Sequence, residues 1–199
     1  MKGFEFLKPS KIITFLYHPQ EIVRFKAAEA LGKVCKGKSA RNFILRLFWH
    51  LNDESGGYCI GAPLGIAEIG RNNPEVFENF KSKYISLLDD WEVERKYVAY
   101  GIGRTAEIVR NAYPDPVNKL REKLEEIKSG EFRAYAVWAL KMLGEDVSDV
   151  IEYSNEIVGF YDGERIVKLR LRDLIEIFEV VPKQNIKHEE SSYSRRRCG

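Results

Sequence analysis

A hydrophobic pattern with the period of an α-helix recurs along most of the chain. In residues 21–34, small and apolar side chains fall every three to four positions and include Leu31. The pattern returns with Ile66, Ile102 and Leu140 in the place of Leu31, at spacings of 35, 36 and 38 residues. Small residues along one face let helices approach one another closely, so the pattern predicts a stack of helices.

A second amphipathic stretch precedes each of these helices. Pro9, Pro74 and Pro116 suit the first turn of a helix, and Asn73 and Asp115 are expected to cap helix N-termini. The sequence thus predicts four helix pairs, whose first members span residues 9–17, 39–52, 74–88 and 115–128.

One polar column follows the same register. It aligns Arg24, Arg95 and Arg133, with Cys59 at the corresponding position of the second repeat. Asp89 lies six residues before Arg95, in a turn where a carboxylate can accept backbone N–H bonds and reach an arginine of the following helix. We therefore expect structural roles for Arg24, Asp89, Arg95 and Arg133, with Asp89 paired to Arg95.

The turn followed by the pattern VRxxAAxALG, best seen as VRFKAAEALG in residues 23–32, resembles the short HEAT-like repeats of the phycobilisome-lyase type. The resemblance covers residues 9–144. It implies an all-α fold, a right-handed α-α superhelix of about four helix pairs with a concave surface. Such repeats occur in scaffolds, regulators, pigment lyases and DNA glycosylases, so the resemblance implies no single activity.

The period changes after Gly144. Residues 156–174 alternate apolar and basic positions like a half-buried strand, and the central Asp162-Gly163 is a hairpin turn signal. We expect a β-hairpin and a short helix near residues 173–180, forming a cap over residues 148–181 that closes a repeat body of residues 1–147. The alternative is a docking edge for an acidic partner, formed by Lys168, Arg170 and Arg172.

The net charge of the chain is small and unevenly distributed. Lys and Arg number 32 against 30 Asp and Glu, a net charge of +2. Residues 182–199 carry +3, so residues 1–181 carry −1. A nearly neutral body argues against a broad nucleic-acid-binding surface, because such surfaces are strongly basic. The basic tail, residues 182–199, has little hydrophobic content and is predicted to be disordered.

Cysteine usage and hydropathy bear on location. Cys35, Cys59 and Cys198 are an odd number without CxxC spacing, which is typical of a reducing interior. No apolar run approaches the roughly 18 residues of a membrane span. The sequence therefore predicts a cytoplasmic protein with no membrane partner.

The irregular passage HLNDESGGYCIGAP, residues 50–63, is the candidate binding site. Trp49 and Tyr58 offer contact area, and the carboxylates and hydroxyl of the turn offer polar recognition. Pro63 is expected about two turns inside the helix, where it would introduce a kink. The alternative is structural: the turn caps a helix and its glycines permit close packing. The predicted binding residues are Trp49, His50, Asp53, Glu54, Ser55, Tyr58 and Cys59.

No recognised catalytic motif is present. The sequence GIGRT, residues 101–105, lacks the preceding strand of a phosphate loop, so its glycines indicate helix packing. We expect a non-enzymatic scaffold or regulatory module that binds another protein on its concave face, with no metal or cofactor.

The sequence also admits two other classes. A nucleic-acid-binding protein resembling the HEAT-like DNA glycosylases would use Arg71, Arg104, Arg110, Tyr97 and Tyr100. A lyase or chaperone for a tetrapyrrole or metal cofactor would use Cys59 and His50 with the nearby carboxylates.

Overall fold

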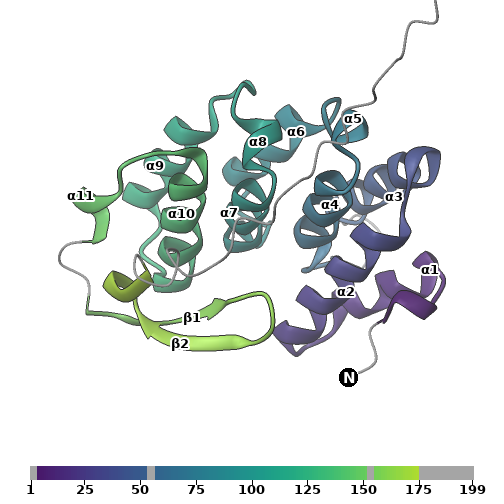
Figure 1. Ribbon diagram of the computed structural model, residues 1–199, viewed down its shortest axis with the longest axis horizontal. Helices are drawn as coiled ribbons and strands as arrows, with labels where there is room; N and C mark the ends of the chain where they lie inside the picture. The colour runs from purple at the N-terminus through teal and green to yellow at the C-terminus, as the bar shows by residue number, and fades with distance from the viewer. Residues whose placement is uncertain (1–3, 53–56, 152–154, 175–199) are drawn as a thin grey trace, which may run out of the picture.

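Four inner helices lie side by side in chain order along the molecule (Figure 1). The computed structural model describes residues 4–52, 57–151 and 155–174. Each inner helix packs on the next, and the Phe25 ring of the first also approaches the Tyr135 ring of the last, with centroids 6.2 Å apart. The inner helices are α2 (Glu21–Val34), α4 (Ala62–Arg71), α7 (Arg95–Arg104) and α10 (Gly130–Leu143).

Further helical segments precede and separate the inner helices. The predicted stretch 74–88 is broken into three pieces, whereas residues 116–126 form one helix that the Asp115 carboxylate caps by accepting from the Asn118 N–H at 2.8 Å. The segments are η1 (Phe4–Phe6), α1 (Pro9–Ile12), η2 (Ile13–Tyr17), α3 (Gly37–Trp49), α5 (Pro74–Phe77), α6 (Lys81–Ser86), η3 (Leu87–Asp89), α8 (Ala106–Val109), α9 (Pro116–Glu126) and α11 (Ser148–Ile151).

The chain then forms the predicted hairpin. Strands β1 (Ile157–Tyr161) and β2 (Ile166–Arg170) pair antiparallel, and η4 (Leu171–Asp173) follows. Gly163 in the turn has a φ of 105°, a left-handed conformation that favours glycine. The turn signal in the sequence is confirmed, whereas the predicted helix near residues 173–180 lies mostly outside the described residues.

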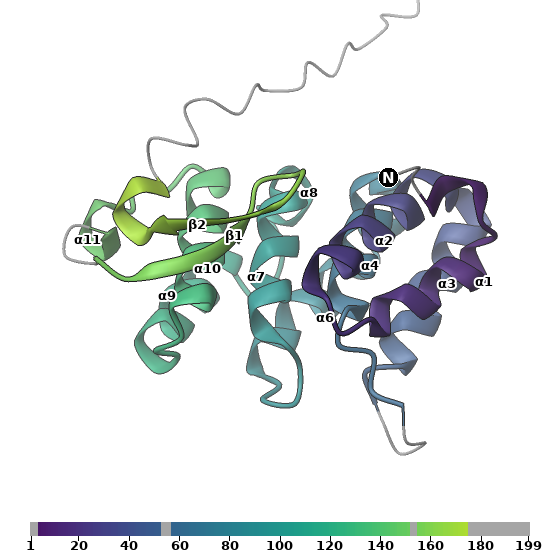
Figure 2. The same ribbon diagram turned by 90° about the horizontal axis from the view of Figure 1, so that it is seen from below.

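The hairpin extends well beyond α10, the last of the inner helices. It crosses beneath α10 and α7 towards α2 (Figures 1 and 2). The Tyr161 ring stacks on Phe25 of α2 with centroids 4.2 Å apart, and the Lys26 Nζ donates to the Gly163 carbonyl at 2.8 Å. The cap therefore ties the two ends of the inner row together, which a cover for the last repeat alone would not do.

Small residues set the spacing of the inner helices. A Cβ on Gly101 would overlap the hydroxyl of Tyr84 and lie 2.6 Å from the Cβ of Ala67 on α4. The buried Tyr84 hydroxyl donates to the Pro63 carbonyl at 3.0 Å, so it is held in place. The glycines of residues 101–103 thus serve helix packing, as the sequence indicated.

The arginine column is only partly as expected. Arg24 is buried, and its Nη1 donates to the carbonyls of His18 and Pro19 at 2.6 and 2.9 Å, so it ties down the preceding turn. Arg133 is half-buried, and its Nε has no hydrogen-bond partner among the described residues.

The predicted pairing of Asp89 with Arg95 is wrong. Asp89 instead pairs with Lys119 and Lys123 of α9, at 3.0 and 3.2 Å. Arg95 pairs with Glu126 of the same helix at 3.0 Å. The reason is geometric: α9 places two long cations and a carboxylate beside this turn, and these groups compete successfully for both partners.

Two local expectations are also corrected. Helix α4 begins at Ala62, so Pro63 lies in the first turn, where it is favoured, and introduces no kink. The Asn73 side chain does not cap its own helix. Its Nδ2 donates to the carbonyls of Cys35 and Ile69, at 3.0 and 2.8 Å, because the adjoining loop of the first repeat presents an unpaired carbonyl to it.

We predict that Gly101→Ala destabilises the fold by about 1–3 kcal/mol, because the added methyl group must displace the fixed Tyr84 ring. Urea unfolding followed by circular dichroism measures this change. Gly57→Ala is the matched control, since a Cβ there meets nothing within 4 Å. Equal stabilities of the two variants would contradict this account of the spacing.

We also predict a loss of stability at alkaline pH. Burial raises the pKa of Tyr58 to about 12 and raises those of Tyr84, Tyr97, Tyr100, Tyr135 and Tyr161 well above the ordinary range. Because the folded pKa values exceed the unfolded value of about 10, this stability is complete below that pH and falls as pH rises above it. Phenolate absorbance should therefore rise together with unfolding. Ionisation of all the tyrosines while the protein keeps its full helical circular dichroism signal would contradict this.

Candidate functional site

The structure separates the residues of the expected binding patch. Trp49 and His50 lie at the end of α3, whereas Tyr58 and Cys59 lie in the segment before α4. Residues 53–55, which supply the expected Asp53, Glu54 and Ser55, lie outside the described residues. The four described residues differ sharply in exposure and in their partners.

His50 is held by its neighbours. Its Nδ1 lies 3.0 Å from the Tyr17 hydroxyl, and its Nε2 accepts from the Arg46 Nε at 3.3 Å. Burial, followed by the charge of Arg46, lowers the pKa of His50. The imidazole is therefore neutral at physiological pH, and both of its ring nitrogens are engaged. Trp49 beside it is 60% exposed.

Cys59 is a core residue. Its side chain is fully buried, and its backbone N–H donates to the His50 carbonyl at 3.2 Å. Burial raises the pKa of this thiol to about 12, against the smaller opposing effect of a hydrogen bond with Tyr17. The thiol is thus protonated and closed to solvent, which does not suit it to metal binding or cofactor attachment.

Tyr58 links the segment before α4 to the turn before α7. Its hydroxyl accepts from the backbone N–H of Glu94 at 2.9 Å, which fixes the turn that leads into α7. One side of the half-buried Tyr58 ring lines a groove of about 260 Å³. Tyr58 is therefore a member of the predicted patch that lines this groove.

We name this cavity the Trp91 groove. Trp91 is 79% exposed, a high value for so large an apolar side chain. The apolar side chains that line the groove include the buried Phe132 of α10. The lining residues are Tyr58, Ile60, Trp91, Glu92, Val93, Glu94, Arg95, Lys96, Ile127, Ser129 and Phe132.

The unpaired charge of the Trp91 groove is acidic. Lys96 is engaged by Glu21 and Glu131, whose hydrogen bonds outweigh burial and raise its pKa. Arg95 is engaged by Glu126. Within the described chain, Glu92 and Glu94 have no cationic partner, so they set the charge that a ligand would meet.

One feature of the sequence indicates this groove, although it belongs to no recognised motif. Trp91 stands in an acidic turn, DDWEVE, where neither helix periodicity nor strand alternation explains a tryptophan. Tyr58 and Glu94 are also 36 residues apart, which is the repeat spacing. The spacing of the sequence pattern therefore indicated a contact between Tyr58 and Glu94.

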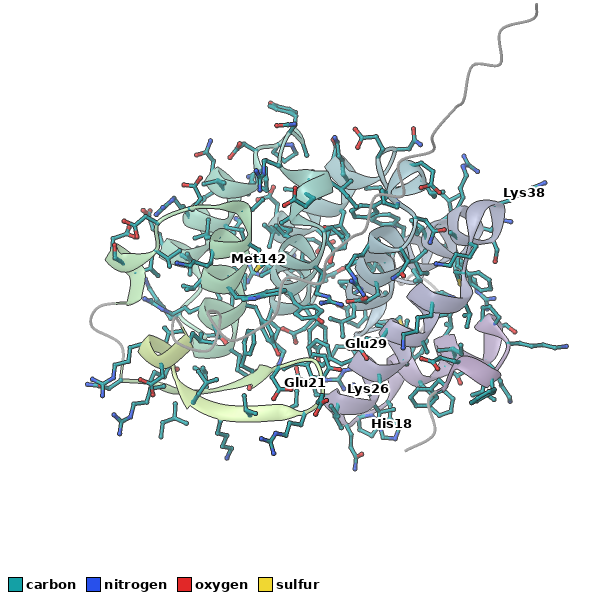
Figure 3. The ribbon with its side chains drawn as sticks, in the orientation of Figure 1. His18, Glu21, Lys26, Glu29, Lys38 and Met142 are labelled. Carbon is teal, nitrogen blue, oxygen red and sulfur yellow. The ribbon has the colours of Figure 1, made fainter. Side chains whose placement is uncertain are left out.

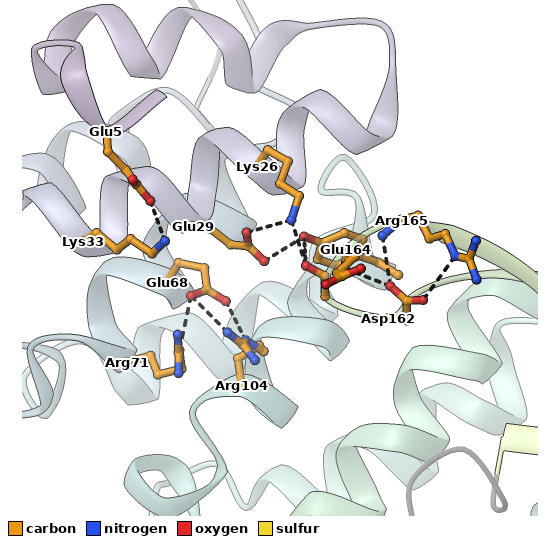
Figure 4. A network of polar contacts seen from close by, with 12 residues as sticks. Glu5, Lys26, Glu29, Lys33, Glu68, Arg71, Arg104, Asp162, Glu164 and Arg165 are labelled. Carbon is orange, nitrogen blue, oxygen red and sulfur yellow. Dashed lines mark hydrogen bonds and ion pairs between the residues drawn. The ribbon is translucent and has the colours of Figure 1, made fainter. Parts of the chain in front are cut away.

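The residues proposed for a glycosylase-like surface are mostly committed elsewhere. Glu68 is 1% exposed, and it receives Arg104 at 2.6 Å and Arg71 at 3.2 Å (Figure 4). Burial opposes ionisation of Glu68, but the two guanidinium groups outweigh it and lower the pKa. Tyr97 and Tyr100 are buried, so they present no face on which a base can stack.

Two further observations concern sites of other kinds. In residues 4–52, 57–151 and 155–174, no group of three or more His, Cys, Asp or Glu side chains is arranged to hold a metal ion. No helix in these ranges has both the length and the apolar character needed to cross a bilayer.

We predict that native protein resists alkylation at Cys59. Iodoacetamide reacts with the thiolate, and burial keeps this thiol protonated at a pH of about 8. Mass spectrometry should find Cys59 unmodified in native protein and fully modified in urea, with Cys35, whose pKa burial raises to about 11, behaving alike. Rapid labelling of Cys59 in the folded protein would contradict its burial and make Cys59 a candidate ligand of a metal or cofactor again.

Comparison with known proteins gives a relative but no activity. No protein-family model and no solved structure matches the chain. The chain is 74% identical over 176 residues to an uncharacterized protein of Archaeoglobus fulgidus, covering 87% of this chain and 96% of that protein. At this identity and coverage, the chain belongs to the same family as the Archaeoglobus fulgidus protein.

Proposed function

We propose that the chain is a HEAT-like repeat protein, a right-handed superhelix of about four helix pairs over residues 1–147 with a cap at 148–181 and a basic tail. Contacts between equivalent positions support this. Glu68 and Arg104 pair across 36 residues, and the Gly37 N–H donates to the side-chain Oδ1 of Asn73 at 3.1 Å, again across 36 residues. Contacts that repeat at the sequence period are what a stack of similar units produces.

We propose further that this protein is a non-enzymatic interaction module that binds another protein at the Trp91 groove. The observation that supports this most strongly is Trp91 itself, 79% exposed beside a groove of about 260 Å³. Tryptophan is among the side chains that contribute most to protein binding when a partner covers it. A shallow groove with an aromatic rim suits an extended peptide segment.

The charges of the groove favour a basic partner. Glu92 and Glu94 have no cation opposite them in the described chain, whereas Arg95 and Lys96 are already neutralised. A peptide with an apolar anchor and adjacent lysine or arginine would cover Trp91 and satisfy both carboxylates. The proposal therefore moves the predicted patch from the end of α3 to the turn before α7.

A cytoplasmic setting without a bound cofactor is part of this proposal. Cys35 and Cys59 are free and buried, as in proteins of reducing compartments. The His50 imidazole and the Cys59 thiol, the side chains considered for a cofactor, are engaged or enclosed by this chain's own residues.

Selection of a random peptide library on the purified full chain tests this function. We expect enriched peptides to combine an apolar residue with Lys or Arg, and Trp91→Ala to weaken their binding at least about tenfold. Trp49→Ala is the matched control, because Trp49 is also exposed but lies outside the groove. Failure to enrich any peptide, or equal binding by the two variants, would contradict the assignment.

A further inference from the structure

Positive charge is concentrated at one end of the molecule. Residues 1–52 contain ten Lys or Arg and three Asp or Glu, a net charge of +7. Residues 53–181 contain seventeen against twenty-five, a net charge of −8. Helices α1 and α3 lie at the same end of the molecule in both views (Figures 1 and 2). The near-neutral body therefore consists of two oppositely charged parts, which its total charge concealed.

The basic residues of α3 are left without acidic partners. Lys38, Arg41 and Arg46 are exposed, and none forms an ion pair within the described residues. Lys38 projects into solvent from the outer end of the helix (Figure 3). By contrast, the α9 cations Lys119 and Lys123 are each paired with two or more carboxylates.

These side chains form a continuous surface along the helix, which we name the α3 stripe. Lys38, Asn42 and Trp49 recur at helical spacing on one exposed face, with the two arginines to either side. Lys38 and Arg46 are eight residues apart, which is about 12 Å along an α-helix. Cations at such intervals suit a linear chain of negative charges. The stripe consists of Lys38, Arg41, Asn42, Leu45, Arg46 and Trp49.

The stripe ends on exposed aromatic side chains. Trp49 is 60% exposed and Tyr17 is 38% exposed, with His50 between them in edge contact with both rings. Lys83 of α6 adds a further cation, 4.7 Å from the centre of the Phe48 ring. A row of cations that leads to an open indole ring is a feature of surfaces that bind unpaired bases.

We propose that the α3 stripe binds single-stranded nucleic acid. Phosphate groups lie along Lys38, Arg41 and Arg46, and a base stacks on Trp49. This second activity is independent of the Trp91 groove, because the two surfaces share no residue.

The form of the stripe distinguishes single strands from other polyanions. A duplex keeps its bases stacked internally and leaves Trp49 without a partner. A bilayer requires an apolar helical face, and that face of α3, including Ile44 and Leu47, is buried in the core. An acidic peptide would satisfy the cations but supplies no ring to stack on Trp49.

Fluorescence anisotropy of the full chain with a labelled oligothymidylate of about twenty nucleotides tests the proposal. We expect salt-dependent binding that Lys38→Gln/Arg41→Gln weakens at least fivefold, with the slope of log affinity against log salt reduced by about 1.4 for two lost cations. Trp49→Ala should weaken binding about tenfold and abolish the quenching of tryptophan fluorescence on binding.

Lys128→Gln/Lys141→Gln is the matched control, because it removes the same charge from exposed positions outside the α3 stripe. It should bind like the wild type, and circular dichroism should show all variants folded. The proposal is overturned if the oligonucleotide does not bind or if the control loses as much affinity. It is equally overturned if a duplex, polyglutamate or phosphatidylglycerol vesicles bind more tightly, or if Trp49→Ala has no effect.

Discussion

The close approach of the inner helices is the constraint on which the other features depend. At Gly101 there is room for a hydrogen atom but not for a methyl group, because the Tyr84 hydroxyl and Ala67 occupy that space. This spacing brings equivalent positions of neighbouring helices within reach of one another. The Glu68 carboxylate can then receive Arg104 from the next repeat, and Tyr58 can hold the backbone of Glu94. Larger residues at the helix crossings would separate these pairs before they formed.

The hairpin determines which surfaces remain available to ligands. Its aromatic side chains pack on those of α2, α7 and α10, and the Tyr161 hydroxyl lies 2.7 Å from the Glu29 carboxylate. The inner-helix surface beneath it is therefore occupied by the chain itself. The two surfaces proposed for binding lie elsewhere, at the turn before α7 and along α3. Tyr97 and Tyr100, which the sequence suggested for nucleic-acid binding, belong to this packed interior.

The distribution of ion pairs separates charges that stabilise the fold from charges that are free to recognise a partner. Around α7 and α9 several cations face carboxylates of another element, as Arg95 faces Glu126 and Lys96 faces Glu21. Exposed pairs of this kind contribute little stability individually, about 0–1 kcal/mol, but they neutralise the surface. The α3 stripe has no such compensation within the described residues, and Glu92 and Glu94 lack it at the Trp91 groove. The unpaired charges at the two sites thus differ in sign, which favours different ligands.

The sequence alone determined the features that depend on local periodicity and local turn chemistry. It placed the inner helices, the hairpin with its Asp162-Gly163 turn and the Asp115 cap, because each of these follows from residues within a few positions of one another. Only the tertiary structure decided the long-range choices. Asp89 selects Lys119 and Lys123 instead of Arg95, Cys59 enters the core, and Trp91 is left open. Several partners or environments suit each of these side chains equally well in the sequence, and the choice among them depends on which helices the packing brings within a few ångströms.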